Sequence, residues 1–445
     1  WHRFMAFVEA RLKSYGVVDI ARNRWSYDLW STSEWPDDSR WRLVSDGAPV
    51  KVAHYAAWSG ATGPEGVTAS LVCYNPSLPP ESLHGKIVVF PVAPHPKPPL
   101  DDNYKTWFTL NDYEHITDAE TFPPLFTAVP VGVSVSYDVW WQLRQTARVT
   151  ALLQKARAAG SLVVFNMPYD RVAGLYTFPV PALYNVPTLY LDRNAGRKVL
   201  ADCQKGAQAT LTLQASVKPV ETYQLIGYLP GRDYGTDHDE RILLRTHTDG
   251  PAISQENGAF GILGLVAYFS RIPQQDRPRT LMVYLDNRHY MPGMEEAFED
   301  RDWFARHPDA RRGIVGLVAL EHLGQREFKE EGEALVPTGR VEPSFLWTRS
   351  DRDLIDQAIQ AAKDHRWPRV LVQAVERPGT HGGKQGVWYG MGRKAVEWNL
   401  PAFSTMGTQG AYWSTAARLD KFDRDLFRTQ VAVMARLTGV LMTRK

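Results

Sequence analysis

From residue 219 onward the chain alternates apolar strand-like runs with helix-like segments, and this alternation restricts the fold more than any other feature. Strands separated by helices of ordinary length usually pair in parallel, and the connecting helices cover both faces of the sheet. The second half therefore predicts an α/β domain with a mixed, mostly parallel sheet. The expected strands are residues 242–244, 280–285 and 313–320, and the expected helices are residues 258–271 and 295–306.

The first 218 residues have a different character. A helix is expected at residues 2–15, followed by a short strand at 16–20. Beyond residue 60, prolines are dense and the apolar runs are short, which is typical of a β-rich module. Its expected strands are residues 68–72, 86–90 and 161–165, with one helix at residues 151–159. Because 445 residues exceed one ordinary core, we expect an N-terminal segment (1–59) packing on the α/β domain, an inserted β-rich domain (60–218) and the α/β domain itself (219–445).

Composition narrows the class of protein without naming a function. The formal charge is +2, so nothing points to nucleic acid or to an anionic membrane, and no apolar run is long enough to span a bilayer. The two cysteines, Cys73 and Cys203, are interpreted as buried thiols, with one disulfide between them as the alternative. The chain begins at Trp1, so we expect that an upstream segment has been removed. If that segment is a secretory signal, the protein is secreted or periplasmic.

Ionisable residues follow three successive strands of the α/β half. His247 and Asp249 follow the first strand, the Asp286–His289 tetrapeptide follows the second, and Glu321 and His322 follow the third. Glu256 precedes the helix that begins near residue 258. Carboxylates and imidazoles brought to one edge of a sheet are the ligand types that zinc and similar ions prefer.

Each of these residues also has an ordinary structural interpretation. Glu256 could be a helix-capping acid, and His289 could be a hydrogen-bonded core histidine. Glu321 and His322 could be turn residues, although the apolar run before them favours at least one of the two facing the cleft.

In its order of motifs the chain resembles the zinc-dependent aminopeptidase and glutamate carboxypeptidase-like superfamily, in the form that carries an inserted protease-associated domain. In the insert, the resemblance is carried by GKIVV at residues 85–89, KARAAG at 155–160 and VPT at 186–188. In the α/β half, the His-x-Asp triplet of the family matches residues 247–249. The resemblance implies that His247 binds the metal and that Asp249 orients the His247 imidazole without binding the metal itself.

The resemblance extends to the other family positions. It places the bridging acid on Glu256, the glutamate ligand on His289 and a further ligand on Glu321. Whichever of Glu256 and Glu321 is not a tight ligand could serve as the base. The segment GTH at residues 379–381 resembles the family's Ser-Asp-His, and it makes His381 another candidate base. The segment YWST at residues 412–415 places the oxyanion-stabilising tyrosine on Tyr412.

The departures from the family pattern matter most. Arg288 stands where the family has its general base, and Trp413 stands where it has its last histidine ligand. Arginine cannot accept a proton near neutral pH, so we expect Arg288 to bind a substrate carboxylate or phosphate instead. The remaining ligands favour one divalent ion, with zinc first and other transition metals as alternatives.

Two functions of different class remain. The first is a metal-dependent hydrolase with a single ion that acts on a peptide, an amide or another small-molecule substrate. The second is a non-catalytic protein that uses a peptidase-like fold for binding or as a scaffold. The identity of the substrate and the oligomeric state cannot be read from the sequence.

Overall fold

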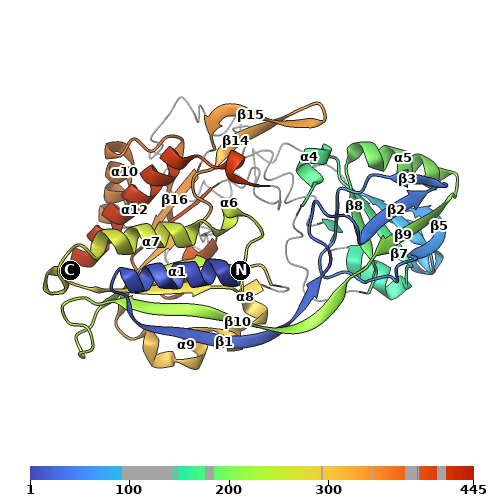
Figure 1. Ribbon diagram of the computed structural model, residues 1–445. Coiled ribbons are helices and arrows are strands. Elements are labelled where there is room, and N and C mark those ends of the chain that lie inside the picture. Colours follow the sequence, from blue (N-terminus) through green and yellow to red (C-terminus); the bar gives the residue numbers. More distant parts are fainter. Residues whose placement is uncertain are drawn as a thin grey trace.

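The computed structural model describes residues 1–92, 145–146, 149–175, 185–291, 294–342, 344–349, 351–375, 388, 390–407 and 417–444. Within them lie two eight-stranded sheets and a separate hairpin. Figure 1 shows a larger half, where helices pack on the first sheet, and a smaller half built around the second sheet. In the described ranges no helix is both long and apolar enough to cross a membrane.

The first sheet is mixed, as expected, with parallel pairs at its centre. β11 lies between β12 and β13 and is parallel to both, and β13 is parallel to β18. The strand order is β1-β10-β12-β11-β13-β18-β16-β17. These strands span Val18–Ser31 (β1), Ser216–Leu229 (β10), Arg241–His247 (β11), Thr280–Asp286 (β12), Ile314–Leu320 (β13), Ser344–Arg349 (β16), Val370–Val375 (β17) and Ala402–Gly407 (β18).

Helices cover both faces of this sheet. On one face lie α1 (His2–Ser14), α7 (Gly258–Phe269), α10 (Arg352–Asp364) and α12 (Arg424–Thr443), and their apolar side chains share one core cluster with the strands. On the other face, α9 (Trp303–Arg306), η6 (Gly390–Arg393) and α11 (Lys394–Glu397) pack on Tyr284 and Trp347. Burial of these two apolar faces stabilises the α/β half.

The helix expected at residues 295–306 is not continuous. The chain there forms α8 (Met294–Ala297), η4 (Glu299–Arg301) and α9 in succession. Asp302 is extended and accepts a hydrogen bond from the backbone N–H of Phe304, so it caps a new helix instead of continuing the old one. Side-chain capping, which apolar periodicity does not report, explains the difference.

The second sheet has the order β3-β2-β9-β5-β6-β7-β8-β4 and includes three strands from the N-terminal segment. The change of sheet therefore lies between β1 and β2, and not at residue 59. Its strands span Trp41–Ser45 (β2), Ala48–Val50 (β3), His54–Tyr55 (β4), Val67–Cys73 (β5), Ile87–Pro91 (β6), Gly160–Val164 (β7), Thr188–Leu191 (β8) and Gln208–Leu213 (β9), with helices α4 (Tyr169–Val172) and α5 (Arg193–Gln204) beside them.

Cys73 and Cys203 form a disulfide between β5 and α5, with their Cα atoms 5.7 Å apart. The expectation of two free thiols is therefore wrong, and the alternative of one disulfide holds.

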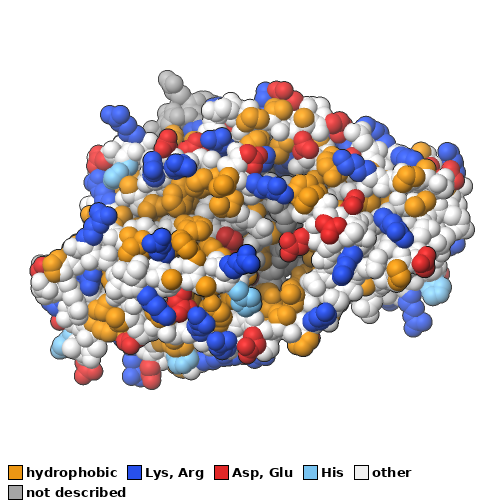
Figure 2. All heavy atoms as spheres, viewed as in Figure 1, with side chains coloured by type: hydrophobic (Ala, Val, Ile, Leu, Met, Phe, Trp, Pro, Cys, Tyr) orange, Lys and Arg blue, Asp and Glu red, His pale blue; other side chains and the backbone are white. Residues whose placement is uncertain are grey.

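Two long strands join the halves. β1 and β10 pair antiparallel from Val18 opposite Tyr228 to Ser31 opposite Ser216, and Figure 1 shows this ribbon running from the larger half to the smaller one. The hairpin of β14 (Arg326–Glu331) and β15 (Ala334–Val341) forms a two-stranded sheet of its own. On the face drawn in Figure 2, charged side chains of both signs are interspersed, as the near-neutral composition predicts.

Candidate metal centre

The carboxyl ends of three neighbouring strands bring the predicted site residues together. β11 ends at His247, which pairs in register with Asp286 at the end of β12. β13 ends at Leu320, so Glu321 and His322 follow it directly. Parallel strands end at one edge of the sheet, where α/β folds place their ligands.

Three side chains form a compact group at this edge. His247 Nε2 lies 3.1 Å from His322 Nε2 and 3.7 Å from Glu321 Oε2. Ligand atoms from these three residues lie within 4.8 Å of one another, and all three residues are buried. Two ligands on a tetrahedral zinc ion, each with a bond of about 2.0–2.1 Å, lie about 3.3 Å apart. The two measured separations bracket this value.

Glu321 is held so that one carboxylate oxygen faces His247. The backbone N–H of Met391 donates to Oε1, whereas Oε2 is buried without a hydrogen-bond partner among the described residues. A Cβ on Gly390 would lie 2.3 Å from Oε1, so only glycine allows this approach. Burial raises the pKa of Glu321 to about 7. A buried carboxylate oxygen without a donor is a position where a cation fits.

The two histidines of the group are in the form that binds metal. Burial, followed by repulsion from His289, lowers the pKa of His247 well below its ordinary value and lowers that of His322 to about 3. Both imidazoles are therefore neutral near pH 7, and a metal ligand must be neutral. The donor set of two imidazoles and one carboxylate is one that catalytic zinc sites use with a fourth position open.

Glu256, at the end of α6 (Ile253–Glu256), lies on the opposite side of the His247 ring. Its Oε1 is 3.5 Å from His247 Nδ1, and it accepts a hydrogen bond from the backbone N–H of Gly250. Burial and the neighbouring Asp249 raise the pKa of Glu256 well above its ordinary range. Asp249 itself accepts the backbone N–H of Tyr290 at 2.7 Å. Glu256 thus places a carboxylate beside His247 Nδ1, although this nitrogen has no hydrogen-bond partner among the described residues.

His289 is close to the group but is bound elsewhere. Its ring stacks on that of His247, with centroids 4.7 Å apart, and its Nδ1 lies 2.9 Å from Glu295 Oε1. Burial lowers the pKa of His289, but the Glu295 carboxylate raises it more, to about 9. In the absence of a metal His289 is thus an imidazolium ion, and it is not one of the three residues whose ligand atoms form the compact group.

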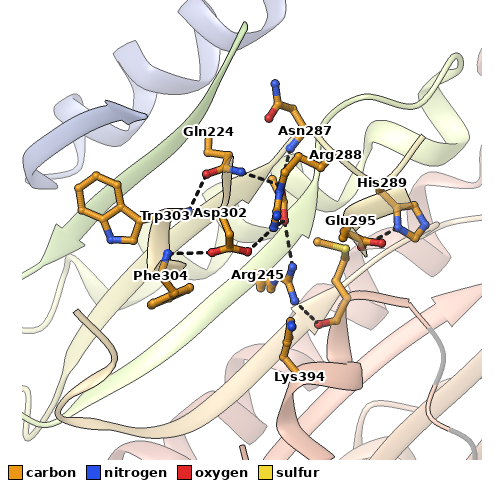
Figure 3. A network of polar contacts seen from close by, with 12 residues as sticks. Gln224, Arg245, Asn287, Arg288, His289, Glu295, Asp302, Trp303, Phe304 and Lys394 are labelled. Atoms are coloured by element: carbon orange, nitrogen blue, oxygen red, sulfur yellow. Dashed lines mark hydrogen bonds and ion pairs between the residues drawn. The ribbon is translucent and has the colours of Figure 1, made fainter. Parts of the chain in front are cut away.

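Arg288 is fully buried in a network of ions beneath the site (Figure 3). Its Nε and one terminal nitrogen donate to the two oxygens of Asp286 at 2.9 and 2.8 Å. The guanidinium also donates to Asp302 and to the backbone oxygen of Phe298. Arg245 donates to Asp286 as well, at 2.9 Å.

The ion network leaves Arg288 no accessible donor for a substrate. Burial raises the pKa of Asp286, but the guanidiniums of Arg288 and Arg245 lower it more, so this pKa lies well below its ordinary range. This geometry argues against the anion-binding role that the sequence suggested for Arg288, because its guanidinium is buried and bonded to Asp286, Asp302 and the backbone oxygen of Phe298.

Two predicted residues, His381 and Tyr412, lie outside the described residues, as does Trp413. Sequence reasoning also missed one member of the group. The family resemblance places a ligand on Glu321 and none on the residue after it, so His322 was not predicted as a ligand. His322 has a φ of +52°, however, and this left-handed conformation lets both side chains meet His247. The adjacent Glu-His pair was the only signal in the sequence.

Neither a protein-family model nor a curated protein sequence matches this chain. Solved structures do match it over nearly its whole length. A peptidase M28 precursor from Shewanella amazonensis SB2B is 14% identical, with 99% of this chain and 87% of that chain covered and a TM-score of 0.63. A zinc aminopeptidase from Bacillus subtilis is 10% identical, with 98% and 88% covered and a TM-score of 0.58.

An aminopeptidase from Aneurinibacillus sp. strain AM-1 is 13% identical, with 98% of this chain and 87% of that chain covered and a TM-score of 0.54. Identities this low show a shared fold and do not transfer an activity. The predicted fold class is confirmed: the chain has the α/β fold of these peptidases.

Proposed function

Because the chain has the fold of zinc aminopeptidases, we propose that it is a hydrolase dependent on one divalent metal ion held by His247, Glu321 and His322. Zinc suits two imidazoles and a carboxylate best, and other transition metals accept the same donors. When bound, such an ion lowers the pKa of a bound water and polarises a carbonyl. The observation that carries the proposal is the unpartnered buried oxygen of Glu321 facing two neutral imidazoles.

The proposal gives the surrounding residues separate tasks. Glu256 places a carboxylate 3.5 Å from Nδ1 of His247, and the backbone N–H of Met391 orients Glu321. His289 is left outside the ligand set because the compact group consists of His247, Glu321 and His322. A single ion is favoured over two because three other family ligand positions hold Trp413, which cannot bind a metal, His289, which contacts Glu295, and Glu256, which lies beside His247 Nδ1.

The remaining roles rest on the resemblance alone. We assign stabilisation of an oxyanion to Tyr412 and proton transfer to His381, and we assign the smaller half to a protease-associated-like domain. A peptide or another amide is the proposed substrate class. The alternative is a non-catalytic binding protein, which is favoured by one observation: Arg288, at the family position of the general base, is locked in the internal network with Asp286.

Hydrolysis assays test the enzyme against the binding protein. We expect the purified protein to cleave some member of a panel of aminoacyl anilides and amides. Dialysis against a chelator should abolish cleavage, and added zinc should restore it. Glu321→Gln should lower the rate at least about a hundredfold, whereas Glu331→Gln, an exposed acid on the hairpin, should leave it unchanged.

Two outcomes count against hydrolysis dependent on this metal site. Cleavage that survives the chelator, or that is equal in wild type and Glu321→Gln, would remove the metal from the reaction. Stoichiometric metal without cleavage of any substrate would support the non-catalytic alternative.

A further inference from the structure

His322 has a backbone conformation that needs external support. Its φ of +52° lies in the left-handed region, which is unfavourable for a residue with a side chain. Such a conformation persists only where surrounding contacts determine it. The contacts that fix the chain just after His322 therefore decide whether its imidazole reaches His247.

Asn257 supplies the closest of these contacts. Its side-chain amide donates to the backbone oxygen of Leu323 at 2.6 Å and accepts the backbone N–H of the same residue at 2.8 Å. The amide thus fixes both polar groups of the residue that follows His322. Asn257 is 1% exposed, so water does not compete for these bonds.

The amide of Asn257 makes its bonds outside its own helical segment. Asn257 joins α6 to α7 in a helical conformation, with φ −74° and ψ −8°, and its side chain makes no capping bond. The side chain instead spans 66 residues of sequence to reach Leu323. This long-range contact points to a role outside the helix.

The start of α7 is fixed against the strand ends, so Asn257 is a rigid anchor. A Cβ on Gly258 would lie 2.2 Å from both the backbone oxygen of Leu320 and Oγ1 of Thr246. Thr246 Oγ1 also donates to that same backbone oxygen at 2.6 Å. The helix therefore cannot shift along β13 without losing these contacts. Asn257, which directly precedes Gly258, thus keeps a constant distance to Leu323.

We propose that Asn257 is a positioning residue for the metal site: its amide holds Leu323 so that His322 stays left-handed and directs its imidazole at His247. The inference rests on the proposed metal centre and adds a residue that does not touch the ion. It explains how Glu321 and His322, adjacent in sequence, can both contribute to one group.

Metal affinity measured by competition with a chromophoric chelator tests the proposal. Asn257→Leu keeps the branched shape of the side chain, with a larger volume, and removes both hydrogen bonds, so the zinc dissociation constant should rise about tenfold or more. Asn257→Asp keeps the acceptor for the Leu323 N–H and should give a smaller rise. Thr280→Val is the matched control, because Thr280 bonds Gly231 and Asp239 at the opposite end of the same sheet. It should lower stability without changing the zinc dissociation constant.

A second comparison separates positioning from general weakening. In a His322→Ala background, Asn257→Leu should change the zinc dissociation constant less than twofold, because the ligand through which it acts is gone. An unchanged dissociation constant in Asn257→Leu, or an equal change with and without His322, would overturn the proposal.

Crystal structures of metal-free wild type and Asn257→Leu keep the inference testable if wild type binds no metal and the proposed function fails. His322 should leave the left-handed region in the variant, and its Nε2 should move away from His247. An unaltered His322 would overturn the inference on its own.

Discussion

Glu327 lies fully buried on β14, where its carboxylate joins two guanidiniums. Arg369 donates to Oε1 at 2.8 Å, and Arg340 and Thr338 donate to Oε2 at 2.9 and 2.6 Å. Burial raises the pKa of Glu327, but the hydrogen bonds from Thr338 and Arg369 lower it more, so this pKa lies below its ordinary value. Removing one partner of such a buried pair leaves an uncompensated charge.

We expect Glu327→Gln to lower the free energy of unfolding by about 3 kcal/mol at pH 7. Because the folded-state pKa is depressed, the contribution is complete above the unfolded-state pKa of about 4.3 and is lost as the pH falls through the folded-state pKa. The difference between wild type and variant should therefore shrink in acid. Urea unfolding at pH 7 and below pH 4 measures it.

The exposed acid Glu331, which pairs with Lys329 on the same strand, is the control. Glu331→Gln should change stability by less than about 0.5 kcal/mol at either pH. A Glu327→Gln penalty that stays constant as the pH falls would show that the carboxylate charge is not its cause.

The β14–β15 hairpin is the element that connects the metal centre to the smaller half. It begins four residues after His322, and its Glu330 lies 3.4 Å from Arg193 of α5 and 3.9 Å from Arg171 of α4. Arg193 also lies 3.5 Å from Glu333. The hairpin thus reaches two helices that pack on the second sheet.

A double-mutant cycle measures this contact. Arg193→Ala and Glu330→Ala should show a coupling energy of about 0.5–1 kcal/mol in thermal or urea unfolding, because both side chains are about three-quarters buried and share partners. The pair of Arg312 and Asp309 is more than four-fifths exposed and should show no measurable coupling. Additive effects for Arg193 and Glu330 would mean that the hairpin and α5 are energetically independent.

Elements with strong apolar periodicity could be predicted from the sequence. The strands expected at residues 280–285 and 313–320 agree within a residue or two with β12 and β13, and the first helix agrees with α1. The expected helix at 295–306 failed because the caps of short helices depend on side-chain bonds such as that of Asp302. The short strand expected at 16–20 is the start of a strand that continues to Ser31, since a long edge ribbon has weak alternation.

For the whole molecule, sequence pattern predicted the type of fold better than the boundaries of its parts. Residues 41–55 pair with strands of the second sheet although they precede the expected insert. β2 pairs with β9, and β4 pairs with β8, which places residues 41–55 in the second sheet. Pairing between residues so far apart in the chain gives no local pattern in the sequence. His322 could not be predicted as a ligand for the same reason, because its role depends on a left-handed φ and on an amide 65 residues away. His247 and Glu321, in contrast, follow directly from strand ends.

The central claim is that His247, Glu321 and His322 bind one metal ion and that the adjacent His289 does not. Metal content by plasma mass spectrometry, after saturation with zinc and gel filtration, tests it most directly. Wild type and the control His238→Ala, which changes an exposed histidine, should carry one zinc per chain, and His289→Ala should retain it. His322→Ala should carry almost none. Absence of zinc in wild type, or full occupancy in His322→Ala, would contradict the account.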